Sequence, residues 1–143
     1  MPSATLKKFG YPSAVLEEGS RWVVLLRPDQ VTLGSLVLVC KEPVQAFSEI
    51  SSEAFADLQE IIGRIEGALA RVFTYDKINY LMLMMVDPDV HFHIIPRYAQ
   101  ERCFAEISFY DAAWPGPPDL ARVNKIDDAV REALRDHLIA HWN

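Results

Sequence analysis

The sequence of 143 residues predicts one domain of the α+β class, with an antiparallel sheet of about five strands, one long helix and a C-terminal helical extension. Short β-rich apolar runs are followed by a long stretch with helical spacing, then by further β-rich runs and a second helical stretch. Two pairs of runs are joined by short turn-forming segments, as in hairpins. The order strands, helix, strands, helix is typical of the α+β class.

The first hairpin is predicted from residues 13–16 and 22–26, two apolar runs separated by Glu-Glu-Gly-Ser at 17–20. A Pro-Asp-Gln break at 28–30 ends the second run. Gly34 then precedes a third run over residues 36–40. We therefore expect three strands before the first long helix.

That helix is predicted from Ser51 onward, because the apolar spacing becomes helical there. Ser51 is suited to cap its N-terminus. We expect Gly63 and Gly67 to permit close approach to a neighbouring sheet, since glycine otherwise costs about 1 kcal/mol in a helix. The expected apolar stripe consists of Phe55, Leu58, Ile61, Ile62, Ile65, Leu69 and Val72.

A second hairpin is predicted from residues 78–86 and 90–95, joined by Asp-Pro-Asp at 87–89. The methionine-rich run 80–85 is expected to form a central strand buried on both faces. Beyond Arg97 we expect a short strand over 105–110 and a rigid proline-rich loop over 114–118. The last helix is expected to carry Val123, Ile126, Val130, Leu134 and Leu138 on one face.

Composition excludes several classes of function. A net charge of −6 argues against generic nucleic-acid binding. Two cysteines without CxxC spacing provide no disulfide framework and no structural zinc signature. Residues 1–10 lack the apolar core of a signal peptide, and the apolar run 81–86 is too short to span a membrane. We therefore expect a cytoplasmic protein with no nucleic-acid or membrane partner.

Chemistry is most strongly indicated at Asp89, His91 and His93. In an extended strand these side chains share one face, while Val90, Phe92 and Ile94 face a core. Imidazoles serve as nucleophiles, proton carriers or metal ligands near neutral pH. Two other interpretations remain open at this point: satisfied histidines on a half-exposed strand, or a carboxylate-plus-two-histidine metal site. Metal binding is disfavoured, because residues two apart on one strand do not converge on one ion.

Residues 89–97, Asp-Val-His-Phe-His-Ile-Ile-Pro-Arg, resemble the signature of the histidine triad (HIT) family. That signature is His-φ-His-φ-His-φ-φ on a strand, where φ is apolar, often followed by Pro-Arg. The segment 34–44 resembles the family's Gly-His-φ-φ-φ-φ segment. It is most similar to the fragile histidine triad branch, whose members hydrolyse dinucleoside polyphosphates. The resemblance covers a core of about residues 13–98 and leaves an extension of about 99–143.

The resemblance implies a nucleotide hydrolase or nucleotidyl transferase that acts on the α-phosphate of a nucleotide derivative, such as a dinucleoside polyphosphate or a nucleoside phosphoramidate. His91 takes the position of the nucleophile, which forms a nucleotidyl-histidine intermediate. His93 takes that of a hydrogen-bond donor to the phosphate or leaving group. The family works without a bound metal or cofactor and usually forms homodimers, so we expect a homodimer with a small-molecule nucleotide substrate.

The chain departs from the family pattern at three positions. Asp89 stands in the place of the first histidine and is expected to orient the His91 ring, as in an acid–histidine pair. Ser35 stands where many members carry a further histidine, and its hydroxyl is expected to donate to a phosphate. Arg27 falls where relatives place a ribose-binding Asn or Asp. These departures imply an alternative function, a nucleotide-binding protein with weak or no turnover.

Three further residues are expected to contact the substrate. Arg97 is a candidate phosphate anchor, with a surface ion pair as the alternative. Leu25 and Leu36 are expected to contribute to an apolar base pocket drawn from the first strands.

Overall fold

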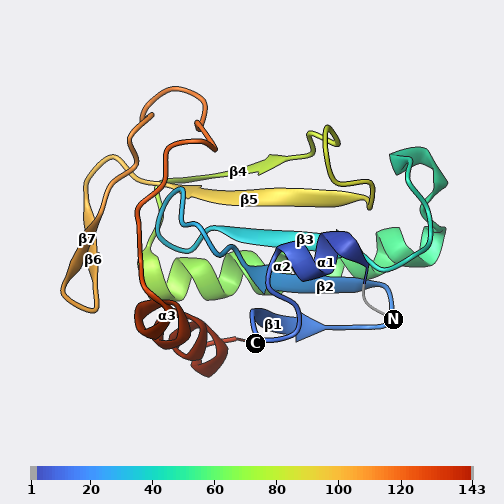
Figure 1. The fold of residues 1–143 in the computed structure, drawn as a ribbon, viewed down its shortest axis with the longest axis horizontal. Helices are drawn as coiled ribbons and strands as arrows, with labels where there is room; N and C mark the ends of the chain where they lie inside the picture. Colours follow the sequence, from blue (N-terminus) through green and yellow to red (C-terminus); the bar gives the residue numbers. More distant parts are fainter. Residues whose placement is uncertain (1–2, 143) are drawn as a thin grey trace.

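The computed structural model describes residues 3–142 (Figure 1). Its five-stranded antiparallel sheet has the order β1-β2-β3-β5-β4, which confirms the predicted fold class. The strands of this sheet are β1 (Val15–Glu18), β2 (Trp22–Leu26), β3 (Leu36–Cys40), β4 (Lys77–Leu81) and β5 (His91–Arg97). A separate hairpin consists of β6 (Arg102–Phe104) and β7 (Ile107–Phe109). The helices are α1 (Ala4–Lys8), the 3-10 turn η1 (Phe47–Glu49), α2 (Ser52–Phe73) and α3 (Asp128–Ala140).

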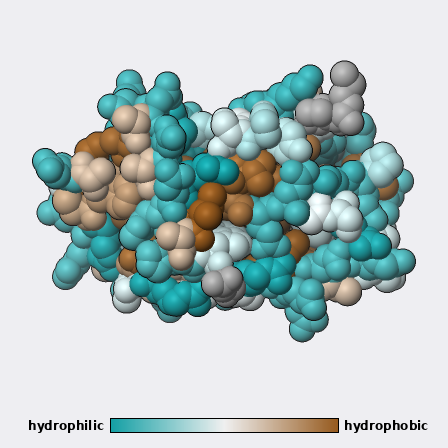
Figure 2. Space-filling model, turned by 90° about the horizontal axis from the view of Figure 1, so that it is seen from below, coloured by the Kyte–Doolittle hydropathy of each residue, from teal (hydrophilic) through white to brown (hydrophobic). Residues whose placement is uncertain are grey.

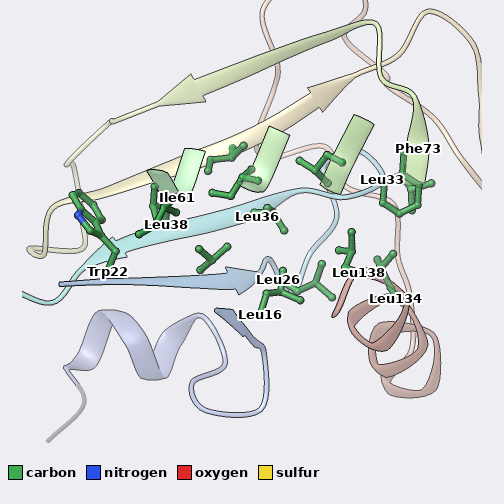
Figure 3. Close-up of a cluster of buried hydrophobic side chains, with 14 of the residues drawn as sticks. Leu16, Trp22, Leu26, Leu33, Leu36, Leu38, Ile61, Phe73, Leu134 and Leu138 are labelled. Atoms are coloured by element: carbon green, nitrogen blue, oxygen red, sulfur yellow. The ribbon is translucent and has the colours of Figure 1, made fainter. Parts of the chain in front are cut away.

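One face of the sheet is covered by α2, whose apolar stripe packs on β2, β3 and β5 (Figure 3). Because side chains alternate between the faces of a strand, Trp22 and Ile94 point toward α2. The Trp22 indole N–H donates to the carbonyl of Ala54 at 2.8 Å, so the buried indole is satisfied. Leu134 and Leu138 of α3 extend this core at one end of the sheet.

Helix α2 begins as predicted, because the Ser51 hydroxyl accepts from the Ala54 N–H at 3.0 Å. The predicted stripe is correct at its centre but wrong at its start, where Phe55 is 45 % exposed. The expected role of the two helix glycines is also wrong. A Cβ on Gly63 would meet nothing within 4 Å, and one on Gly67 would meet only the side chain of Arg71.

The opposite face of the sheet is partly covered by α1, an element that the sequence did not predict (Figure 1). Leu6 and Phe9 from this segment pack on Val37 and Leu25. A five-residue helix is unstable by itself, so α1 depends on this packing and on its cap. The Ser3 hydroxyl provides the cap by accepting from the Leu6 N–H at 3.2 Å.

The methionine-rich run is not a buried central strand. β4 lies at the edge of the sheet and ends at Leu81, and residues 82–90 form a loop. Met84 has a φ of 54°, which breaks the extended conformation, and Met85 is 84 % exposed. The predicted antiparallel pairing of β4 with β5 is correct, but the connection is longer than the expected Asp-Pro-Asp turn.

Several strands and helices near the two ends of the sequence begin or end at other residues than the sequence predicts. Glu17 and Glu18 belong to β1 rather than to the first turn. The strand predicted over 105–110 is β7, and its partner β6 was not predicted. Helix α3 begins after Asp127, whose carboxylate accepts from the Val130 N–H at 2.9 Å. Val123 and Ile126 therefore precede this helix.

The face that carries β1 and α3 is largely hydrophilic, with an apolar band at its middle and a second, paler apolar patch at the left of the view (Figure 2). Among the described residues, no helix combines the length and apolar character needed to cross a membrane.

Candidate functional site

A cavity of about 310 Å³ opens beside β5 on the face of the sheet that carries α1. This volume is at the lower end of the range for small-molecule sites. The walls come from the end of α1, the segment after β2, the loop between β4 and β5, and β5 itself. The lining residues are Lys8, Phe9, Arg27, Pro28, Asp29, Leu83, Met84, Met85, Val86, Asp87, His91, His93 and Leu120.

The two histidines share one face of β5, as the alternation predicts. His91 lies opposite Val39 and His93 opposite Val37 in the pairing with β3. The imidazole centroids are 5.2 Å apart in an edge-to-face arrangement. The histidine face is nevertheless not open, because the Phe9 ring lies 6.1 Å from the His91 ring and 5.8 Å from the His93 ring. His91 is 3 % exposed and His93 is 8 % exposed.

The protonation pattern of His91 follows from one hydrogen bond. Its Nδ1 lies 2.7 Å from the backbone carbonyl oxygen of Asp89. A carbonyl can only accept, so Nδ1 must carry the proton. In the neutral imidazole the lone pair is then on Nε2, which leaves Nε2 as the nucleophilic atom.

His93 is held neutral at physiological pH. Burial, reinforced by the positive charge of Arg27 and by His91, lowers the pKa of His93 to about 4. Its Nδ1 is buried and has no hydrogen-bond partner among residues 3–142. A buried nitrogen without a partner is costly, and a bound ligand could satisfy it.

Two cations and two carboxylates line the cavity around the imidazoles. Lys8 Nζ lies 2.9 Å from a carboxylate oxygen of Asp87. Arg27 donates through Nη1 to the carbonyl of Asp29 at 2.7 Å. Burial lowers the pKa of Arg27, and the carboxylate of Asp29 partly opposes this effect. The cavity can therefore offer positive charge to an anionic ligand.

Asp89 occupies a different place from the one that the sequence suggested. Its side chain lines a second cavity with Tyr11, Cys40 and Lys41, and not the cavity that holds the imidazoles. Asp89 does orient His91, but it does so through its backbone carbonyl rather than its carboxylate. The carboxylate whose charge acts on His93 is that of Asp87, which lines the same cavity.

Ser35, Leu25 and Leu36 do not line the histidine cavity. Ser35 is fully buried, and its hydroxyl donates to the carbonyl of Thr32 at 2.8 Å while accepting from the Thr32 N–H at 3.0 Å. Leu25 packs beneath α1, and Leu36 points to the opposite face, toward α2. These side chains support the sheet on which the site is built.

Arg97 is neither a surface ion pair nor part of the cavity lining. Its guanidinium is 4 % exposed and donates through Nε to Asp111 at 2.7 Å. Further bonds run to the side chain of Asn79 and to the carbonyl of Gly116, both at 2.8 Å. Arg97 thus ties β5 to the loop that follows β7.

Several lining residues could not have been found from local sequence signals. Lys8 and Phe9 come from the unpredicted α1, and Leu120 comes from the C-terminal extension. Asp87 lies in the Asp-Pro-Asp segment, for which the sequence predicts only a turn. Within residues 3–142, no three His, Cys, Asp or Glu side chains are grouped to hold a metal ion.

The antiparallel sheet, the long helix and the paired histidines on β5 define a histidine triad protein. The HIT domain family matches residues 10–100, which is more than half of the chain, and the chain therefore belongs to this family. Lys8, Phe9 and Leu120 lie outside the matched region. Comparison with curated proteins gives no significant match.

Solved structures of histidine triad proteins share the fold over nearly the whole chain. A histidine triad protein of Bradyrhizobium japonicum has a TM-score of 0.75 at 21 % identity, covering 99 % of this chain and 97 % of that one. A HIT protein of Sinorhizobium meliloti has a TM-score of 0.76 at 17 % identity, covering 99 % and 96 %. A Hit-like protein of Bartonella henselae involved in cell-cycle regulation has a TM-score of 0.66 at 17 % identity, covering 96 % and 93 %.

Proposed function

We propose that this protein is a nucleotide hydrolase or nucleotidyl transferase that acts on the α-phosphate of a nucleotide derivative. The observation that carries the proposal is the hydrogen bond between His91 Nδ1 and the carbonyl of Asp89, 2.7 Å long. It fixes the tautomer in which Nε2 has the free lone pair. An activated nucleophile needs such a partner to hold it in its reactive form.

In the proposed reaction, His91 Nε2 attacks the α-phosphorus. An Nε2–P bond forms while the bond from phosphorus to the leaving group breaks, and the electron pair departs with the leaving group. Water then attacks the phosphorus and the Nε2–P bond breaks. The imidazole recovers its lone pair, the nucleoside monophosphate is released and the proton of the water passes to solvent. Another acceptor in place of water makes the reaction a nucleotidyl transfer.

His93 contributes hydrogen bonding rather than acid catalysis. Because its pKa is about 4, it is a neutral imidazole at pH 7. A neutral ring nitrogen that carries hydrogen can donate to a non-bridging phosphate oxygen as charge develops there. Its unpartnered Nδ1 is available for such a contact.

AMP release from diadenosine tetraphosphate and from adenosine 5′-phosphoramidate tests the proposal. His91→Ala is expected to lower the rate of AMP release by about a thousandfold or more, because without the imidazole the nucleotidyl-histidine intermediate cannot form. His137→Ala, in α3 and outside the cavity lining, serves as the matched control and should retain activity. AMP release that is unchanged in His91→Ala would refute the nucleophile assignment.

A second candidate function is nucleotide binding without turnover. It is favoured by Ser35, whose hydroxyl is engaged within the fold, and by Asp89, whose carboxylate faces another cavity. Both positions therefore lack a donor to the phosphate. This function predicts that the wild-type protein binds AMP but releases none from either substrate.

A further inference from the structure

Two cations reach the histidine cavity from different parts of the chain. Arg27 follows β2, and Lys8 is the last residue of α1. The positive charges of both act on His93, since each lowers its pKa. Lys8 lies outside residues 10–100, so it is supplied by an element outside the HIT match.

Each cation has capacity for a further anionic partner. Arg27 Nε is buried and has no hydrogen-bond partner among residues 3–142. Lys8 is paired with Asp87, but the side chains are 52 % and 15 % exposed. Exposed ion pairs contribute little to stability, so Lys8 can exchange Asp87 for a more highly charged phosphate at small cost.

The histidine strand and Asp89 offer no acid that could protonate a leaving group. His93 is neutral at pH 7, and the Asp89 carboxylate faces another cavity. An amine must gain a proton as its P–N bond breaks. A phosphate, in contrast, can depart as an anion with the electron pair of the P–O bond, and it needs positive charge around it.

We propose that Lys8 and Arg27 form a subsite for an anionic leaving group, so that the protein prefers nucleoside polyphosphates to nucleoside phosphoramidates. This inference rests on the proposed function for its catalytic part. The recognition of a polyphosphate chain by Lys8 of α1 does not depend on that function, because it concerns binding alone. Arg27 is suited to two phosphate oxygens through its planar guanidinium, whereas Lys8 acts as a mobile point charge.

The test compares Lys8→Gln with Lys7→Gln, which removes the neighbouring charge of the same helix from an exposed position outside the cavity lining. Calorimetry would measure the affinities for ATP and for adenosine. Lys8→Gln is expected to weaken ATP binding about tenfold, the loss typical of one charge-assisted hydrogen bond, and to leave adenosine binding unchanged. Lys7→Gln should change neither affinity. Asp87→Asn frees Lys8 and is expected to tighten ATP binding.

Equal ATP affinities in Lys8→Gln and Lys7→Gln would overturn the subsite. In the kinetic arm, Lys8→Gln is expected to lower AMP release from diadenosine tetraphosphate about tenfold more than release from adenosine 5′-phosphoramidate. Equal losses on both substrates would overturn the leaving-group preference. Absence of AMP release from the wild-type protein would refute the proposed function alone, because the ATP affinities still decide the subsite.

Discussion

The backbone carbonyl oxygen of Asp89 lies 2.7 Å from Nδ1 of His91 and sets the tautomer of the proposed nucleophile. The orienting atom belongs to the main chain, so the identity of side chain 89 matters less than its backbone position. In an acid–histidine pair a carboxylate accepts the hydrogen bond from the imidazole. Here the peptide carbonyl of Asp89 accepts it instead. We therefore expect an aspartate at position 89, where the family signature has a histidine, to be compatible with the proposed nucleophile.

Asp89→Asn is therefore expected to keep AMP release within about threefold of wild type, a change of less than 1 kcal/mol in activation free energy. The substitution preserves the carbonyl and nearly the same side-chain shape. Steady-state kinetics with diadenosine tetraphosphate would measure the effect. A loss of a hundredfold or more would show that the carboxylate itself takes part in the reaction.

His93 should make stability pH-dependent between about pH 6.5 and pH 4.5. In this window the unfolded chain protonates position 93, whose ordinary pKa is 6.5, whereas the native pKa of about 4 keeps the folded ring neutral. The unfolded state thus binds more protons, and the free energy of unfolding falls by about 2 kcal/mol as the pH drops across the window. Urea unfolding at several pH values would measure this slope.

The matched variants for that measurement are His93→Gln and His137→Gln. His93→Gln removes the titrating group and should flatten the slope, while His137→Gln should retain it. Glu17 and Glu42 have pKa values lowered from 4.5 by hydrogen bonds, mainly from Arg64 and from Ser51 respectively, so they act below this window. An equal slope in both histidine variants would contradict the assignment.

Breaking the buried ion pair between Arg97 and Asp111 should be strongly destabilising, because it leaves an uncompensated buried charge. Asp111→Ala leaves the Arg97 guanidinium, which is 4 % exposed, without its carboxylate. We expect a loss of about 3–5 kcal/mol in the free energy of unfolding. Asp57→Ala breaks the half-exposed pair with Arg21 and should cost less than about 1 kcal/mol. Similar losses in the two variants would contradict this distinction.

Two glycines should respond in opposite directions to alanine. Gly34 has a φ of +88°, and a Cβ there would lie 3.0 Å from the ring of Phe73. Gly34→Ala is therefore expected to lower the free energy of unfolding by about 2–3 kcal/mol. Gly63 lies at an exposed position of α2, where an added Cβ would meet nothing within 4 Å, so Gly63→Ala should raise the free energy of unfolding by about 0.5–1 kcal/mol. Thermal unfolding would compare the variants, and a stabilised Gly34→Ala would contradict the packing argument.

Local patterns were sufficient to predict the central parts of this fold. Alternation placed His91 and His93 on one face of β5, and helical spacing with a serine cap located α2. Both features depend on neighbours in the sequence. The strand assigned to the methionine run failed because apolar character alone does not distinguish a core strand from an exposed loop beside a cavity.

Long-range partners account for what the sequence did not reveal. Lys8 meets Asp87 across 79 positions, and no periodicity links them. The short α1 depends on the contacts of Leu6 and Phe9 with the sheet, which no local sequence pattern predicts. The sequence alone predicts a phosphate ligand at Arg97, because its partner Asp111 is brought to it only by the fold.

The central claim is that His91 forms a covalent bond to the α-phosphorus. Mass spectrometry of the protein, mixed briefly with diadenosine tetraphosphate and stopped in alkaline denaturant, tests it most directly. We predict an adenylyl group on the peptide that contains His91, and its absence in His91→Ala. An adenylyl group on His93, or rapid AMP release in which His91 is never modified, would contradict the account.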